Sequence, residues 1–143
     1  MISTRGRYVL RVMIDLAQHE DGAYHPMREV AVRQGISVKY LERILPPLSR
    51  GGLLEGVQGK GGGYRLKRPP KECSVGEILR LTEGGMAPVA CLEAEASPCP
   101  RQDCCTTFPM WREFYQLTHD YFDSITLEDF LSGRFAQPCD GPE

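Results

Sequence analysis

The segment Gly59–Gly63 has glycine at four of its five positions and separates two short apolar segments. Residues 53–58 and residues 64–66 have the length and composition of strands, so the pattern predicts a β-hairpin with a glycine-rich tip. Because glycine has no side chain and adopts positive φ freely, such a tip can lie close to another surface. A nucleotide-binding phosphate loop is excluded, because no Gly-Lys-Ser/Thr motif follows and the next element has the pattern of a strand where a helix is needed.

Three helices are predicted before this hairpin. Apolar residues at intervals of three and four indicate a helix over residues 4–19, with Ser3 as its N-cap. A second helix is expected over residues 26–34, with proline at its first position, and a third begins at residue 38 after the N-cap Ser37.

The second and third helices have the spacing of a helix-turn-helix motif. Ala31 provides the small residue needed where two helices cross, and Gly35 tolerates positive φ at the turn. Leu41 and Ile44 supply the apolar inner face of the third helix, which the Pro46-Pro47 pair is expected to end or kink. Together with the hairpin that follows, the motif predicts a winged helix-turn-helix.

The second half begins with a helix and a cysteine-rich loop. The segment Ser74–Glu77 has the pattern of a capping box and predicts a helix through Thr82, with Gly84-Gly85 as its stop. A loop is expected over residues 86–107. A long helix follows, starting at Pro109.

This long helix carries many aromatic and aliphatic residues at helical spacing. They are Trp111, Phe114, Tyr115, Leu117, Tyr121, Phe122 and Ile125. A small domain cannot easily bury so many aromatic side chains on one helix, so we interpret it as a dimerisation helix; a helix within the chain's own core is the alternative. Thr126 with Asp129 caps a last short helix, and residues 136–143 are predicted to be a disordered tail.

Charge is divided unequally between the two halves of the chain. Residues 1–71 carry 13 Lys and Arg against 6 Asp and Glu, a balance of +7, whereas residues 72–143 carry 4 against 13, a balance of −9. The net charge of −2 therefore conceals a basic first half suited to phosphate groups. No segment approaches the roughly 18 apolar residues of a membrane span, and the N-terminus lacks a signal-peptide pattern. We therefore expect a cytoplasmic protein without a membrane partner.

Four of the six cysteines lie in the loop over residues 86–107. In the reducing cytoplasm, such cysteines are more often metal ligands or redox sensors than disulfides. Thiolates suit soft metals, so an iron–sulfur cluster and zinc are both candidates. The lack of a Cys-x-x-Cys pair disfavours a zinc ribbon and a dithiol enzyme, so no enzymatic activity is expected. Cys73 and Cys139 stand alone and are interpreted as structural or incidental.

Five motifs occur in order along the chain: Ser3–Tyr8, Gly35–Glu42, Gly61–Leu66, Val75–Ile78, and Trp111 followed by Ile125–Leu127. In these motifs the chain resembles the IscR/NsrR-type bacterial regulators, the Rrf-two family, and the resemblance runs over residues 3–131. It implies a homodimer with a winged helix in each subunit and a long crossing helix between them. It also implies binding to pseudo-palindromic, double-stranded promoter DNA, usually as a repressor.

The resemblance also implies a set of metal ligands in the loop. The cysteines that match are Cys91, Cys99 and Cys105, which would hold an iron–sulfur cluster, 2Fe-2S or alternatively 4Fe-4S. Where one branch of the family has a histidine as fourth ligand, this chain has Phe108, and where other branches use a carboxylate it has Arg7. Cys104 is the remaining candidate for the fourth ligand.

DNA contacts are predicted on the third helix and on the hairpin. They are Ser37, Lys39, Tyr40, Glu42 and Arg43 on the helix, and Gln58, Lys60, Gly61, Gly62 and Arg65 on the hairpin. Glu42 could accept a hydrogen bond from a cytosine amino group or repel unsuitable sites, with a solvent-exposed charge as the alternative. An arginine common in the family is Gln58 here and Lys60 replaces a proline, so cationic minor-groove contact is expected to have moved by two residues.

The predicted fold is therefore mainly α with a small β-wing, in three parts. These are a winged helix-turn-helix over residues 1–71, a connecting helix and sensor loop over 72–108, and dimerisation and terminal helices over 109–135. The predicted function is a DNA-binding transcriptional regulator whose promoter binding is controlled by an iron–sulfur cluster. The alternative keeps the same DNA-binding dimer without a cluster and has it sense thiol oxidation or a small metabolite.

Overall fold

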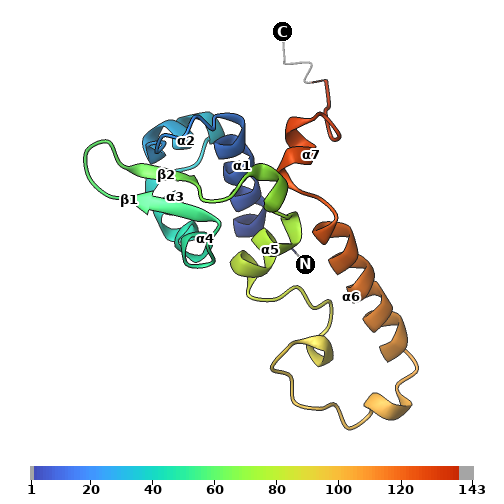
Figure 1. The fold of residues 1–143 in the computed structure, drawn as a ribbon. Coiled ribbons are helices and arrows are strands. Elements are labelled where there is room, and N and C mark those ends of the chain that lie inside the picture. Colours follow the sequence, from blue (N-terminus) through green and yellow to red (C-terminus); the bar gives the residue numbers. More distant parts are fainter. Residues whose placement is uncertain (1, 139–143) are drawn as a thin grey trace.

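The computed structural model describes residues 2–138 as a helical body with a β-hairpin at one side and a long helix extending from it (Figure 1). The helices are α1 (Thr4–Gln18), α2 (Met27–Gln34), α3 (Val38–Ile44), α4 (Pro46–Arg50), α5 (Val75–Glu83), α6 (Phe108–Asp123) and α7 (Leu127–Leu131), and the strands are β1 (Leu54–Val57) and β2 (Gly63–Leu66). Short 3-10 helices lie at Pro70–Glu72, Ala90–Leu92 and Gln102–Cys104. No helix in this part of the chain combines the length and apolar character required to cross a membrane.

The predicted fold class is confirmed, because the described chain is mainly helical with a small antiparallel sheet. β1 and β2 pair with Leu54 opposite Leu66 and Val57 opposite Gly63. The glycine-rich tip joins them, and Gly61 has a φ of 78° there, which glycine adopts without strain. The strands begin and end within one residue of the predicted limits.

Helix α1 forms the centre of the hydrophobic core. Its residues Val9, Val12, Met13 and Leu16 are at most 1% exposed and belong to a cluster that includes apolar side chains of α2, α3, α4 and the hairpin. Each fully buried side chain of this size stabilises the fold by roughly 1.5–3 kcal/mol. Helices α5 and α7 also pack against α1, so the chain returns to the body after α6 (Figure 1).

Most of the predicted helix ends are confirmed. Ser3 and Ser37 cap α1 and α3 by accepting hydrogen bonds from the main-chain N–H groups of Gly6 and Tyr40, each at 3.2 Å. Gly35 ends α2 with a φ of 65°, the left-handed conformation expected at the turn of a helix-turn-helix. The Gly35 turn and the Ser37 cap orient α3 relative to α2.

Other predicted helix ends differ in the structure. Pro26 is the N-cap of α2 rather than its first residue. Ser74 caps α5 by accepting from the N–H of Glu77, but the Glu77 carboxylate pairs with Arg68 at 2.8 Å instead of completing the capping box, because a charged donor binds a carboxylate more strongly than a main-chain N–H does. Pro46 ends α3 as predicted and also starts α4, a helix that was not predicted, since its fixed φ suits a first helical turn.

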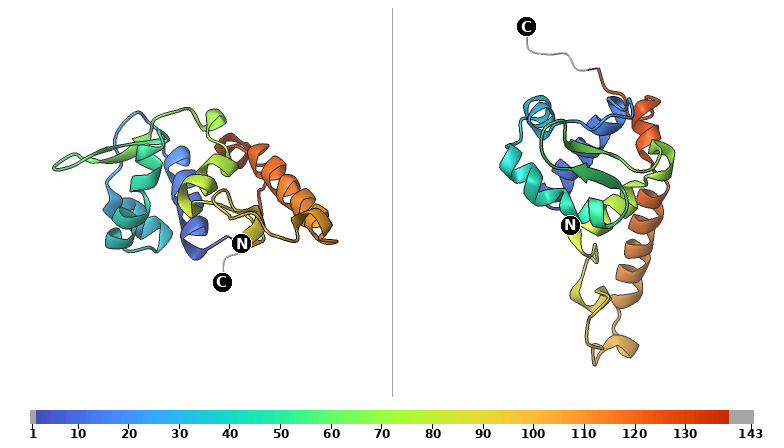
Figure 2. Two further views of the ribbon diagram at one scale, coloured as in Figure 1. Left: turned by 90° about the horizontal axis from the view of Figure 1, so that it is seen from below. Right: turned by 60° about the vertical axis from the view of Figure 1, so that its left-hand side comes forward.

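Helix α6 extends away from the body beside the loop over residues 86–107 (Figure 2). It begins at Phe108, one residue before the predicted start, and none of its residues is buried. Phe122, near its end, packs against Val75 and Leu79 of α5. Residues 136–138 have no helix or strand, and the rest of the predicted tail, with Cys139, lies outside the described residues.

Candidate nucleic-acid interface and cysteine loop

Helix α3 presents charged residues on the side opposite to its buried face. Leu41 and Ile44 are buried in the core, as the helix-turn-helix pattern predicted, whereas Lys39, Glu42 and Arg43 are exposed. The structure therefore brings these three predicted DNA-contact residues to one solvent-facing surface. An exposed helix of this kind is the element that helix-turn-helix proteins place in the major groove of DNA.

Tyr40, another predicted contact, is only half-buried on α3. Its ring packs edge-to-face against Tyr8 of α1, with the ring centroids 5.9 Å apart. Such aromatic pairs contribute roughly 0.5–1.5 kcal/mol beyond the area that they bury. Tyr40 therefore helps to hold α3 against α1, whatever contact its hydroxyl makes with a ligand.

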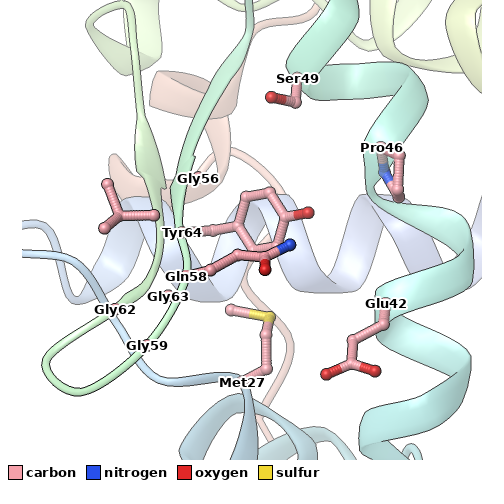
Figure 3. A pocket seen from close by; sticks show the side chains of 11 residues that line it. Met27, Glu42, Pro46, Ser49, Gly56, Gln58, Gly59, Gly62, Gly63 and Tyr64 are labelled. Atoms are coloured by element: carbon pink, nitrogen blue, oxygen red, sulfur yellow. The ribbon is translucent and has the colours of Figure 1, made fainter.

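A groove of about 660 Å³ separates α3 and α4 from the hairpin. The side chains of Glu42, Gln58 and Tyr64 point into it from its two sides (Figure 3). Tyr64 was not predicted as a site residue. It lies directly opposite Gly56 in the sheet, where a Cβ would come within 2.9 Å of the Tyr64 ring, so the glycine gives the ring its room. The sequence contains a signal that could have predicted this arrangement, which is a tyrosine placed opposite a glycine in the predicted hairpin.

The groove combines a hydrogen-bond donor and a negative charge. Burial and the nearby negative charge of Glu42 raise the pKa of the Tyr64 hydroxyl above its ordinary value, so this group, protonated at neutral pH in any tyrosine, is even harder to ionise here. Ser49 of α4 adds a second hydroxyl group (Figure 3). A protonated phenol and a serine hydroxyl can both donate to phosphate oxygens.

The hairpin tip is exposed and basic. Lys60 is exposed at its end, and a Cβ on Gly62 would lie 2.2 Å from the carbonyl oxygen of Val57, so the chain can close the tip only with glycine there. None of the salt bridges within residues 2–138 involves Lys39, Arg43 or Lys60. These cations are therefore available to an anionic partner. Arg65, by contrast, is engaged within the chain.

A buried carboxylate holds α1 to the end of α2, a feature that the sequence did not indicate. Asp15 is 2% exposed, and Arg33 donates to both of its oxygens, with Nη2 at 2.7 Å and Nε at 3.0 Å. Gln34 donates to the same carboxylate at 2.8 Å, and Arg11 donates to the side-chain oxygen and the carbonyl oxygen of Gln34. Although burial raises the pKa of Asp15, the Arg33 and Gln34 hydrogen bonds and the Arg33 charge outweigh it and lower that pKa.

The loop that contains the predicted metal ligands is open. Cys104 is exposed, and Cys91, Cys99 and Cys105 are half-buried. Three thiols on one accessible loop suit a soft metal chemically. Within residues 2–138, however, no group of three or more His, Cys, Asp or Glu side chains is arranged to hold a metal ion. The donor set therefore suits an iron–sulfur cluster chemically, but the described residues do not bring these thiols together in one site.

Two of the cysteines have pKa values that are shifted in opposite directions. Hydrogen bonds from the Thr107 hydroxyl and from the N–H groups of Thr107 and Phe108 lower the pKa of Cys105, beside the first turn of α6. Burial raises the pKa of Cys73 to about 11, and its thiol contacts the carbonyl oxygen of Pro69 at 3.6 Å. Cys73 is therefore a protonated core residue at neutral pH, as its isolated position in the sequence indicated.

A family model described as "Rrf2: Iron-dependent Transcriptional regulator" matches residues 2–133 of the chain. The chain is 31% identical over 133 residues to "HTH-type transcriptional regulator IscR" of Pectobacterium carotovorum, covering 93% of this chain and 80% of that relative. It is 35% identical over 138 residues to "Protein rrf2" of Nitratidesulfovibrio vulgaris, covering 96% and 90%. Among solved structures, CymR (YrzC), "the Global Cysteine Regulator of B. subtilis", aligns with a TM-score of 0.73 at 32% identity, over 92% of this chain and 96% of that one.

Proposed function

The chain belongs to the Rrf2 family of transcriptional regulators, and on that basis we propose that it binds double-stranded promoter DNA as a homodimer and represses transcription in the cytoplasm. Its relatives are regulators and not enzymes, which agrees with the expectation from sequence. Residues 1–71 would form the DNA-binding region, residues 72–108 the sensor region, and residues 109–135 the dimer contact. The resemblance seen in the sequence motifs is confirmed by the family match.

One observation carries the proposal: the two elements that flank the groove, α3 and the hairpin, carry exposed cations that form no salt bridge within residues 2–138. Lys39 and Arg43 are exposed on α3, and Lys60 is exposed at the wing tip. An α-helix fits the major groove, and a hairpin tip beside it can reach the adjacent backbone or minor groove. We propose phosphate or base contacts for these cations, with Ser37, Glu42, Gln58 and the tip glycines next to them.

Replacing both Lys39 and Arg43 by alanine is expected to weaken DNA binding at least tenfold and to reduce the slope of log affinity against log salt by about two. The probe is a fluorescent duplex that the wild-type chain has selected from a random-sequence pool, titrated at several salt concentrations. Lys67→Ala with Lys71→Ala removes the same two charges from exposed positions that lie on neither α3 nor the hairpin tip, and leaves the slope unchanged. An unaltered slope in the α3 variant would remove these residues from the interface.

Exposed apolar side chains on α6 support the proposed homodimer. Met110, Phe114, Leu117 and Tyr121 are 45–61% exposed, and they follow each other at intervals of four, three and four residues. This spacing places them in a single stripe, as in helices that pack against a second helix. We propose that the α6 helices of two subunits bury these stripes against each other.

The variant Leu117→Asp is expected to be monomeric at micromolar concentration, because it places a charge in the middle of the proposed interface. Sedimentation velocity measures the change in mass. Gln116→Glu introduces the same charge at an exposed neighbouring position off the stripe and should remain dimeric. A dimeric Leu117→Asp variant, or a monomeric wild type, contradicts this arrangement.

For the signal, we propose an iron–sulfur cluster held by Cys91, Cys99 and Cys105, with Cys104 as the candidate fourth ligand. The description of the family as iron-dependent and the three accessible thiols support it. When bound, such a cluster would supply a redox-sensitive centre; the chain's own residues would supply its ligands beside the first turn of α6. The alternative, thiol sensing without a cluster, is favoured by one observation: hydrogen bonds at the start of α6 already lower the pKa of the Cys105 thiol.

A further inference from the structure

The loop between α1 and α2 runs beside the hairpin and joins its sheet. His25 and Tyr64 form an antiparallel bridge with two main-chain hydrogen bonds, from His25 N–H to the Tyr64 oxygen at 2.9 Å and from Tyr64 N–H to the His25 oxygen at 3.0 Å. Gly63 allows this approach, because a Cβ there would lie 2.0 Å from the His25 carbonyl oxygen. The base of the wing is thus fixed to the helix-turn-helix by the main chain.

Arg65, the next residue but one along β2 from Gly63, contacts the same loop. Its Nη1 donates to the carbonyl oxygen of Gly22 at 2.8 Å, and its guanidinium carbon lies 4.3 Å from the centroid of the Tyr24 ring. Its Nε donates to the Glu55 carboxylate at 2.9 Å, directly across the sheet on β1. One side chain therefore joins both strands of the wing to the α1–α2 loop.

These contacts use the specific shape of a guanidinium group. Its flat face stacks on an aromatic ring while its edge donates in two directions, which the ammonium group of a lysine cannot reproduce. The Glu55 carboxylate also balances the charge of Arg65, whereas Lys60, at the tip of the same hairpin, has no ion pair within residues 2–138. Of these two wing cations, Arg65 has its charge balanced within the described residues and Lys60 does not, so Lys60 is the better partner for a phosphate group.

We infer that Arg65 is a positioning residue, which fixes the wing to the α1–α2 loop and so sets the direction of Lys60 relative to α3. The inference rests on the proposed DNA binding and revises the sequence prediction that Arg65 itself contacts DNA. Tyr24 and Glu55 hold Arg65 in this position, although neither carries a positive charge that could bind phosphate.

Salt-dependent DNA titration separates a positioning role from a phosphate contact. We expect Arg65→Lys, Arg65→Gln and Tyr24→Leu each to weaken binding of the pool-selected duplex by about tenfold, with the salt slope of the wild type. The double variant Arg65→Gln, Tyr24→Leu is expected to be no weaker than Arg65→Gln alone, because the contact with the Tyr24 ring is already lost with the guanidinium group. Lys60→Gln is the matched control and is expected to reduce the slope by about one.

Thermal unfolding of each variant shows whether the body remains folded, so that a loss of affinity can be assigned to the wing. If Arg65 contacts phosphate, the pattern is different. Arg65→Lys then retains most of the affinity, and Arg65→Gln reduces the slope by about one. The loss of affinity caused by Tyr24→Leu then adds to that of Arg65→Gln in the double variant. That pattern overturns the inference and leaves the proposed function intact. If the wild-type chain selects no duplex from the pool, the proposed function fails first, and the inference with it.

Discussion

Replacing Arg33 by methionine is expected to destabilise the fold by about 3 kcal/mol at neutral pH, since breaking a buried ion pair leaves an uncompensated charge. Asp15 is 2% exposed and would keep the Gln34 hydrogen bond and the contact with His19, whose Nδ1 lies 3.7 Å from Asp15 Oδ1. Asp15→Asn, which removes the charge and keeps the shape, is expected to cost less, about 1 kcal/mol. Urea unfolding followed by circular dichroism measures both values.

The pH dependence of this pair has a definite sign. In the wild type the pKa of Asp15 is lowered, so its contribution to stability is present above the ordinary carboxyl pKa and is lost as the pH falls through the folded value. In Arg33→Met, Asp15 stays buried with His19 as its remaining ionisable neighbour, and the Asp15 pKa is expected to rise because the Arg33 hydrogen bonds and charge are gone. The deficit relative to wild type should therefore shrink as the solution is acidified towards about pH 4.

Arg28→Met is the control for the loss of an arginine on the same helix. Arg28 is exposed, and no salt bridge within residues 2–138 involves it, so a change below about 0.5 kcal/mol is expected. Equal destabilisation by Arg28→Met and Arg33→Met, or a deficit that does not change with pH, would show that the charge pair is not the cause.

The parts of the fold that could be predicted depend on interactions that close within a few residues. Ser3 and Ser37 act as caps because their hydroxyls accept from an N–H three residues later, and Gly35 acts through its own φ. The glycine-rich tip is equally local. The α3 face that carries Lys39 and Arg43 follows from helical periodicity alone, so the exposed half of the candidate DNA interface was accessible from sequence.

The unpredicted features join residues that are far apart in the chain. Arg33 reaches Asp15 across 18 positions, and Arg65 reaches Gly22 across 43. Periodicity says which face of an element is buried, but it does not say which of several arginines meets a given carboxylate. The cysteine loop shows the reverse case: its thiols are close in sequence, yet within residues 2–138 they form no metal-binding group.

Iron and sulfide are expected to co-purify with the wild-type chain under anaerobic conditions and to be absent from Cys91→Ser, Cys99→Ser and Cys105→Ser. Each variant removes one thiolate ligand, and a serine oxygen is a poor replacement towards iron in a cluster, which prefers soft sulfur donors. Iron and acid-labile sulfide per subunit are measured together with the visible absorption spectrum. Loss of the whole cluster signal in each of the three variants is the expected result.

Among the cysteines outside this set, Cys73 provides the control and Cys104 tests the fourth ligand position. Cys73→Ala should retain full iron and sulfide, because the Cys73 thiol is buried in the core and its raised pKa keeps it protonated. Cys104→Ser tests the fourth position: loss of the cluster makes Cys104 a ligand, and retention requires a ligand from elsewhere. A colourless wild-type protein with all thiols reduced contradicts the cluster, and it leaves the regulator with direct thiol chemistry, for which Cys105 is the first residue to test by alkylation because hydrogen bonds lower its pKa.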